Sequence, residues 1–261
     1  MLILKKGIFY FLIPLLLLFS CKRELITFPM PQPSLDSALL SLKIFPVNNS
    51  ITFSGYKWNV TNSPSKRAAP GNNYWSENSI WVDGKGYLHL KLTKETGTNK
   101  WFCAQISSEK KFGNGLYEFW VEGRLDQLDK NVVFGMFNYS GIDYYDEMDI
   151  EFSRWGEINN QNLHYNVYPE ENTNSARWGS STEFLLTEPY SIHRITRANS
   201  SVKFESYSDF LGRKIHSQLY SASTISKKEM PIYINLWAFK NVAPSDQKQV
   251  EIIIQKFVFT E

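Results

Sequence analysis

The sequence predicts an all-β domain, a sandwich of two antiparallel sheets, in a chain of 261 residues. From about residue 50 onward, short runs of alternating apolar and polar residues are separated by turn-forming residues, which is typical of strands and hairpins. The runs follow one another without long helical segments, and this absence of crossover helices favours antiparallel over parallel pairing. Roughly 210 residues remain after residue 50, enough for one large domain with its own core.

The first predicted hairpin turns at Asp83–Gly86, between Ser79–Val82 and the alternating run Tyr87–Leu92. Only Leu35–Ile44 and part of Thr224–Met230 have a helical pattern, and both are short. The later strands share the same alternation, and we expect them at Gly115–Val121, Val132–Phe137, Asn162–Tyr168, Val202–Tyr207, Ile232–Phe239 and Val250–Phe259.

The N-terminal residues have the pattern of an export signal. Lys5 and Lys6 precede the apolar run Ile8–Phe19, which is too short for a comfortable membrane span. The ending Leu18–Cys21 resembles a bacterial lipobox, which predicts cleavage and a lipidated Cys21, with plain secretion as the alternative. We expect a signal peptide at residues 1–20, a tether at 21–48 and a folded domain at 49–261. The protein would then lie in the bacterial cell envelope, facing the periplasm or the exterior, and touch the membrane only through its lipid anchor.

Charge and cysteine content exclude several functions. The net charge of +2 and the four scattered histidines give no sign of nucleic-acid binding. Once Cys21 is lipidated, Cys103 has no partner for a disulfide, and we expect it to pack as a small apolar residue. No cluster of His, Cys and Asp has the spacing of metal ligands, so neither a metal site nor a cofactor is predicted.

Three acidic residues alternate with three apolar ones in the segment Glu147–Phe152. Alternate side chains of a strand share one face, so Glu147, Asp149 and Glu151 should point together while the residues between them point into the core. Three carboxylates on one face cannot all ionise easily, so a proton should be retained among them near neutral pH. One charged and one protonated carboxyl are what acid/base catalysis requires.

The spacing of Glu147 and Glu151 fits cleavage of a glycosidic bond. Four strand residues span about 13 Å between Cα atoms, and two glutamates that lean inward bring their carboxylates to about 5–6 Å. A retaining glycosidase needs its two carboxyls about 5–5.5 Å apart, whereas an inverting one needs about 6.5–9.5 Å. By itself the pattern is weak, and a solvated strand face would explain it better, so the flanking sequence has to decide.

The flanking sequence holds four further motifs in order. They are the strand Phe53–Trp58, the hairpin that begins at Asn78, the run Lys111–Glu118 and the strand Ile234–Trp237. Together with Glu147–Phe152 they resemble glycoside hydrolase family 16, whose active-site signature has this alternation of acidic and apolar residues. The resemblance covers most of residues 51–259.

This resemblance implies a β-jelly-roll sandwich with a long substrate cleft on its concave sheet. It also implies roles for the three acids: Glu147 as the nucleophile, Glu151 as general acid and then general base, and Asp149 as the residue that orients and tunes them. Many members of the family hold a structural calcium ion on the convex side, but nothing in this sequence identifies its ligands.

Polar candidates for the substrate cleft come from strand position. His164 and Asn166 share one face of a strand expected beside the catalytic one, where they could bond sugar hydroxyls; ordinary polar surface is the alternative. Gln105 and Ser107 stand where lichenase-type members of the family often carry Glu-Tyr-Arg, and we include Gln105 among the substrate-binding candidates.

Aromatic candidates for the cleft are three tryptophans. Trp237 lies in a motif of the resemblance, and we expect it to stack on a sugar rather than fill the core. Trp155 and Trp178 lie beside glycines in stretches that read as loops, and they are candidates for platforms at the rim of the cleft. For both, simple packing is the alternative.

The predicted partner is a β-linked polysaccharide, and the predicted oligomeric state is a monomer. A single residue separates Asp149 from Glu151, a form typical of lichenases and xyloglucan-active members, which favours mixed-linkage or 1,4-linked β-glucan. Departures from the family pattern at Ser153–Gly156, and at Arg197 in place of an expected tryptophan, indicate different sugar contacts. The alternative functions are a transglycosylase on the same scaffold and a glycan-binding module without turnover.

Overall fold

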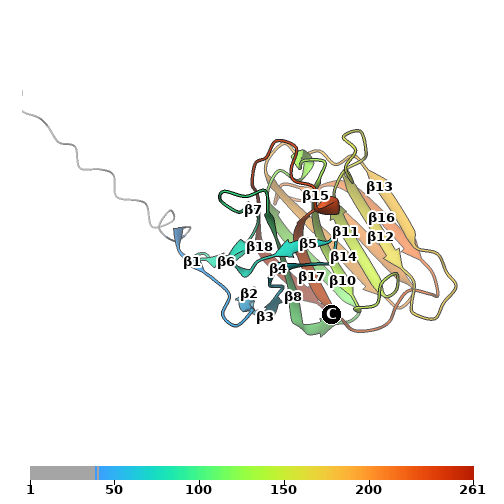
Figure 1. Cartoon of the computed structure of the whole chain (residues 1–261). Helices are drawn as coiled ribbons and strands as arrows, with labels where there is room; N and C mark the ends of the chain where they lie inside the picture. The colour runs from blue at the N-terminus through green and yellow to red at the C-terminus, as the bar shows by residue number, and fades with distance from the viewer. Residues whose placement is uncertain (1–38, 40) are drawn as a thin grey trace, which may run out of the picture. The chain divides into compact units, whose positions relative to one another are not determined.

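The computed structural model describes residue 39 and residues 41–261, and these form a β domain (Figure 1). The predicted signal peptide, the lipidated Cys21 and most of the predicted tether lie outside the described residues. The helical elements that the structure names are short 3₁₀ turns, η1 (Glu77–Ser79), η2 (Leu125–Gln127) and η3 (Phe239–Asn241). Within the described part of the chain, no helix is long and apolar enough to cross a membrane.

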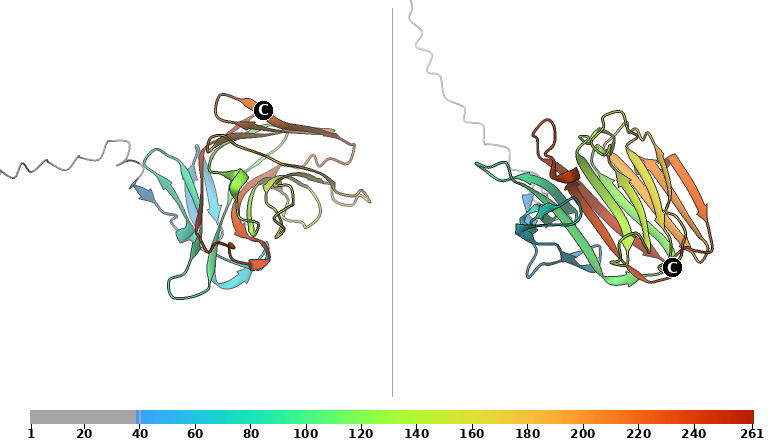
Figure 2. Two further views of the ribbon diagram at one scale, coloured as in Figure 1. Left: turned by 90° about the horizontal axis from the view of Figure 1, so that it is seen from above. Right: turned by 45° about the vertical axis from the view of Figure 1, so that its right-hand side comes forward.

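Two large antiparallel sheets form the layers of the domain, which Figure 2 shows from two further directions. In spatial order, sheet A contains β1 (Lys43–Ile44), β6 (Ile80–Asp83), β7 (Leu88–Lys94), β18 (Val250–Thr260), β9 (Gly115–Glu122), β14 (Tyr190–Ala198), β15 (Ser201–Ser208) and β16 (Arg213–Ser221). Sheet B contains β2 (Ser50–Phe53), β3 (Tyr56–Val60), β8 (Trp101–Phe112), β17 (Met230–Ala238), β10 (Val132–Tyr139), β11 (Glu147–Phe152), β12 (Leu163–Tyr168) and β13 (Trp178–Thr182).

The long strand β8 ties the two layers together. Most of its length pairs with β17 and β3 inside sheet B, while its first residues pair with β7 of sheet A. The short strand β5 (Asn73–Trp75) runs parallel to β8 and carries β4 (Ser63–Ala68) at its side. The sheets are therefore two layers of one continuous hydrogen-bonded system.

The core lies between the two sheets and is built from alternating inward-facing side chains, as period-2 patterning requires. Large rings from both layers meet there: Phe134 and Phe152 of sheet B are fully buried, as are Phe119 and Phe204 of sheet A. Cys103 is buried in the same core, and burial raises the pKa of its thiol to about 12, so it packs as the small apolar residue that the sequence predicts.

The predicted fold class is confirmed: the domain is an all-β jelly-roll sandwich of antiparallel sheets. The predicted hairpin is the β6–β7 pair, and the strands expected later in the chain all form. The helical prediction agrees with Leu39 and Ser41, which are helical, and was wrong in two places. Lys43–Ile44 pairs with β6 as a strand, ahead of the predicted domain boundary at residue 49. Residues 224–229 form an irregular loop, in which Arg197 donates to the backbone carbonyls of Ser226 and Lys228.

Candidate active site

The three acids of β11 lie on the face of sheet B that is turned away from the core. Met148, Ile150 and Phe152, between them, are fully buried against sheet A. Because β11 is hydrogen-bonded to β10 on one side and to β12 on the other, its side chains are held in a fixed register. The alternation read from the sequence therefore holds: one strand gives three side chains to the core and three to the opposite face.

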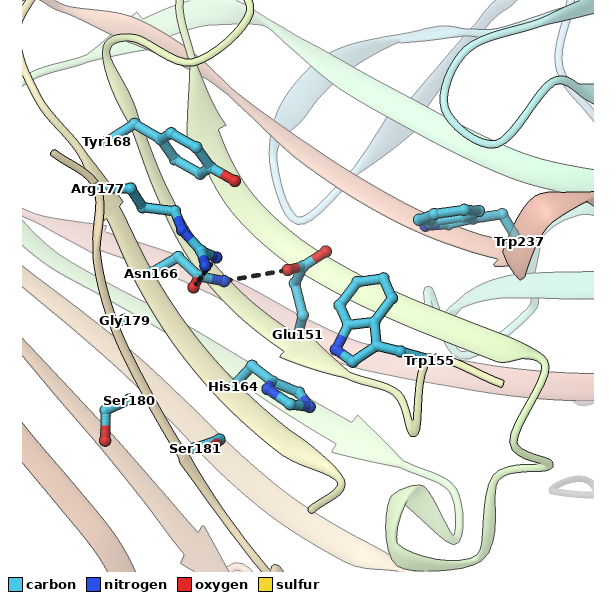
Figure 3. A pocket seen from close by; sticks show the side chains of 10 residues that line it. All are labelled: Glu151, Trp155, His164, Asn166, Tyr168, Arg177, Gly179, Ser180, Ser181 and Trp237. Carbon is cyan, nitrogen blue, oxygen red and sulfur yellow. Dashed lines mark hydrogen bonds between the residues drawn. The ribbon is translucent and has the colours of Figure 1, made fainter. Parts of the chain in front are cut away.

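A cleft crosses this face from β8 to β13, and it has two adjoining parts that share Glu151 and Trp237. We call the first the polar part; it has a volume of about 620 Å³, and its other lining residues are Trp155, His164, Asn166, Tyr168, Arg177, Gly179, Ser180 and Ser181 (Figure 3). We call the second the aromatic part; it has a volume of about 330 Å³, and its other lining residues are Ala69, Pro70, Gln105, Phe137, Tyr139, Asp143, Glu147, Asp149, Tyr233 and Asn235.

Burial and mutual repulsion raise the pKa values of all three acids. Burial, followed by the charge of Glu151, raises the pKa of Glu147 to about 8. Burial, followed by the charges of Glu147 and Glu151, raises the pKa of Asp149 well above its usual range. Because each negative charge opposes the ionisation of the others, this group retains a proton at neutral pH, as the sequence predicts.

Glu151 differs from the other two acids because a cation and an amide act on it. Burial raises its pKa to about 7, while the nearby Arg177 and a hydrogen bond from Asn166 pull that pKa down. The Asn166 amide donates from Nδ2 to Glu151 Oε2 at 3.2 Å. A carboxyl with a pKa near 7 can donate a proton in one step and accept one in the next, which is the behaviour that a general acid/base needs.

A glycine in β10 keeps the floor of the cleft open beside Glu151. Gly135 pairs with Glu151 on one side and with Asn235 on the other. A Cβ atom at this position would lie 2.8 Å from Asn235 Oδ1, closer than real Cβ contacts allow. Any other residue here would displace the buried Asn235 amide, which donates to Gln105 Oε1 at 3.3 Å.

The aromatic part of the cleft has a wall of three rings. Phe137 stacks on Tyr233 with ring centroids 5.3 Å apart, and Tyr139 packs against Tyr233 edge-on. The Tyr139 hydroxyl donates to Asp143 Oδ1 at 2.6 Å, which ties the wall to the loop that precedes β11. Such a wall offers ring faces and edges to the C–H groups of a ligand.

The structure brings five of the six predicted substrate-binding residues to the cleft. Gln105 lines the aromatic part, while His164, Asn166 and Trp155 line the polar part and Trp237 lies between the two. His164 Nε2 donates to the backbone carbonyls of Ser153 and Gln161, at 2.9 and 3.0 Å, so its ring is held by the loop after β11. Burial lowers the pKa of His164.

Trp237 is 7% exposed, and it contacts the core as well as the cleft. The sixth candidate, Trp178, is a correction. It pairs with Val167, whose side chain faces the core, and it stacks on Phe204 and Tyr220 of sheet A. Trp178 therefore packs between the sheets instead of forming a platform at the rim.

Sequence reasoning missed several lining residues. Tyr233 and Asn235 lie on the same face of β17 as Trp237, so strand parity alone could have found them. Arg177 had no such signal, because β13 is not recognisable as a strand from its Trp-Gly-Ser-Ser-Thr sequence. Its place beside Asn166 follows from the pairing of β12 with β13, which no local pattern reveals.

An ion pair between a buried acid and an exposed lysine lies at the start of β11. Asp146, which is fully buried, accepts a hydrogen bond at 2.7 Å from Lys228 in the 224–229 loop, and Lys228 also binds Glu171 at 2.9 Å. Arg197 occupies a position where the family resemblance predicts a tryptophan. It is 2% exposed, and its guanidinium donates to backbone carbonyls of that same loop. Arg197 is therefore a structural residue remote from the lining of the cleft.

Within residue 39 and residues 41–261, no group of three or more His, Cys, Asp or Glu side chains is arranged to hold a metal ion.

No protein-family model matches the chain, and no curated protein matches it. Solved structures do match. A β-glucanase from Bacillus licheniformis is 21% identical, with 84% of this chain and 98% of that chain covered at a TM-score of 0.59. The chain has the fold of the β-glucanases. A β-1,3-1,4-glucanase (lichenase) from a mouse hindgut metagenome is 18% identical, with 82% and 94% covered at a TM-score of 0.56. A β-1,3-glucanase from Mycobacterium marinum is 13% identical, with 82% and 93% covered at a TM-score of 0.57.

Proposed function

We propose that this protein is a glycoside hydrolase of family 16 that cleaves β-linked, glucan-like polysaccharide inside the chain and retains the anomeric configuration. The observation that carries the proposal is the set of three carboxyls on one strand at the floor of a cleft, with Asp149 buried and Glu147 and Glu151 half-buried. The β-glucanase fold and the ordered motifs of the sequence support the same assignment. Two facing carboxyls with different proton occupancy are what glycosidic bond cleavage requires.

The pKa values of about 8 for Glu147 and about 7 for Glu151 put the retained proton of these coupled acids on Glu147 in the free protein, so the proposed reaction requires this proton to pass to Glu151. In the proposed first step, the Glu147 carboxylate then attacks the anomeric carbon while Glu151 gives its proton to the departing glycosidic oxygen. The bond to the leaving sugar breaks, and a covalent glycosyl-enzyme forms on Glu147. In the second step, Glu151 takes a proton from water, whose oxygen attacks the same carbon and releases Glu147. Asp149, beside Glu147, takes part in the hydrogen bonding that holds the nucleophile in place.

The length of the cleft supports endo action on an extended chain. Its lining residues come from strands on both sides of β11, so sugars could be bound on either side of the cleaved bond. The named relatives act on β-1,3 and mixed β-1,3-1,4 glucans, and we propose a substrate of this class. The lipid anchor on Cys21 and a place in the bacterial cell envelope remain part of the proposal.

The test is hydrolysis of lichenan, laminarin and xyloglucan by wild type and by Glu147→Gln, scored as new reducing ends. We expect wild type to cleave at least one of them and the variant to lose at least about 1,000-fold in kcat, because the nucleophile is gone. Glu157→Gln, which changes an exposed acid in the loop after β11, is the matched control and should keep wild-type activity. If both proteins only bind glycan, the protein is a binding module and the enzyme proposal fails.

The stereochemistry of the first product tests the retaining mechanism separately. NMR of the reaction mixture should show the β-anomer before mutarotation, since two inversions at one carbon restore its configuration. An α-anomer as the first product would exclude the covalent intermediate on Glu147. Added oligosaccharide acceptor should leave hydrolysis dominant; longer products in its place would indicate a transglycosylase.

A further inference from the structure

Arg177 is connected to Glu151 through a single amide. Its guanidinium donates from Nη1 to Asn166 Oδ1 at 2.6 Å, and Asn166 donates from Nδ2 to Glu151 Oε2 at 3.2 Å. Figure 3 shows the three side chains in sequence along one side of the polar part of the cleft. An amide has a donor end and an acceptor end, so a cation on its oxygen turns its NH₂ group toward the carboxylate.

The surroundings of Arg177 are shaped for this contact. Gly179 pairs directly with Asn166, and a Cβ atom there would lie 3.0 Å from Asn166 Oδ1 and 3.8 Å from Arg177 Cζ. The missing side chain leaves room for the guanidinium to reach the amide oxygen. On its other side, the Arg177 guanidinium lies over the Tyr168 ring, 5.6 Å from the ring centroid.

We propose that Arg177 is a positioning residue for Glu151: it fixes the Asn166 amide, and the amide holds the carboxyl in place for proton transfer. This inference rests on the proposed hydrolase function, in which Glu151 is the acid/base. Arg177 acts through Asn166 and through its charge, and it needs no contact with the reacting atoms.

Charge gives Arg177 a second effect on the same carboxyl. The groups that face Glu151 are Glu147 and Asp149 on its own strand, and His164 and Tyr168 on β12. The two acids oppose ionisation of Glu151 when they are charged, and Arg177 favours it. Without Arg177, burial would therefore keep the Glu151 proton to higher pH, and the residue would be a weaker acid in the first step.

The experiment is the pH dependence of kcat/KM for wild type, Arg177→Gln and Arg177→Lys on the substrate that wild type cleaves. Arg177→Gln should move the alkaline limb, which reports loss of the Glu151 proton, up by about one pH unit and lower kcat about 10-fold. Arg177→Lys keeps the charge but loses the planar donor. The alkaline limb of the Arg177→Lys profile should stay near that of wild type, while the kcat of this variant falls. Arg213→Gln, an exposed arginine at the edge of sheet A, is the control and should match wild type.

A titration that needs no turnover accompanies the kinetics. In protein carrying ¹³C-labelled glutamate carboxyls, the Glu151 signal should titrate about one unit higher in Arg177→Gln than in wild type. The inference is overturned if neither the limb nor this titration moves, or if the variant raises KM alone, which would make Arg177 a substrate contact. If wild type cleaves none of the glycans while the Glu151 titration still moves, the proposed hydrolase fails and the link from Arg177 to Glu151 stands.

Discussion

The two faces of strand β11 are made from adjacent residues and have opposite effects on the protein. Met148, Ile150 and Phe152 are fully buried among apolar neighbours, and their burial stabilises the fold. Glu147 and Glu151, on the other face, are held partly desolvated near one another, at a cost that their raised pKa values record. One strand thus contributes apolar side chains to the core and carries carboxyls whose ionised form the folded state disfavours. This cost to the folded state is what the proposed catalytic role of the acids would explain.

The largest expected effect is on the acid face and concerns activity. Glu151→Gln should lower kcat on polysaccharide by about 100- to 10,000-fold, because the leaving oxygen is no longer protonated. On an aryl β-glycoside with an acidic phenol, formation of the glycosyl-enzyme should be affected much less, since that leaving group departs without a proton. Burst kinetics with the aryl substrate measure this step. Equal losses on both substrates would argue against the acid role of Glu151.

The next effect is on the apolar face and concerns stability. Ile150→Ala should lower the free energy of unfolding by about 2–5 kcal/mol, because it leaves a cavity between the sheets. Ile142→Ala, in the loop before β11 where the side chain is 39% exposed, is the matched control and should change stability by less than about 0.5 kcal/mol. Urea unfolding measures both. A loss at position 150 no larger than at position 142 would contradict the packing described for β11.

The smallest effect returns to the acid face and depends on pH. The folded state holds a Glu147 proton up to a pKa of about 8, whereas the unfolded chain releases it at its ordinary, lower pKa. Between these two values the folded state binds more protons, so stability falls as pH rises. Glu147→Gln removes this loss and should be more stable than wild type at pH 8 by on the order of 1–3 kcal/mol.

The same variant should match wild type at pH 4, where Glu147 is protonated in both states. Calorimetric melting temperatures at the two pH values test the direction of this stability change. A variant that is less stable than wild type at pH 8 would show that the folded state does not disfavour the ionised form of Glu147. The same substitution would then raise stability and remove activity, whereas a substitution on the apolar face of β11 lowers stability.

The features that could be predicted from the sequence are those that depend on neighbouring residues within one strand. The alternation along β11 assigned Glu147 and Glu151 to one face and Ile150 to the other, and the structure agrees. The face of Trp178 could not be predicted, because it depends on which residue of β12 lies opposite, and that is Val167. Arg177 was missed for the same reason. Its position beside Asn166 depends on the pairing of β12 with β13, and this pairing cannot be predicted from the sequence of either strand alone.

The position of β17 has a consequence for how the protein is made. This strand lies between β8 and β10, although more than a hundred residues separate it from β8 along the chain. Until synthesis has passed residue 238, sheet B is divided into two pieces that have no shared edge, and neither Trp237 nor Tyr233 is present. A chain that lacks β17 therefore has the three acids of β11 but no complete cleft. Closing so long a loop is slow, so the cleft should form late in folding, once β17 has paired with both β8 and β10.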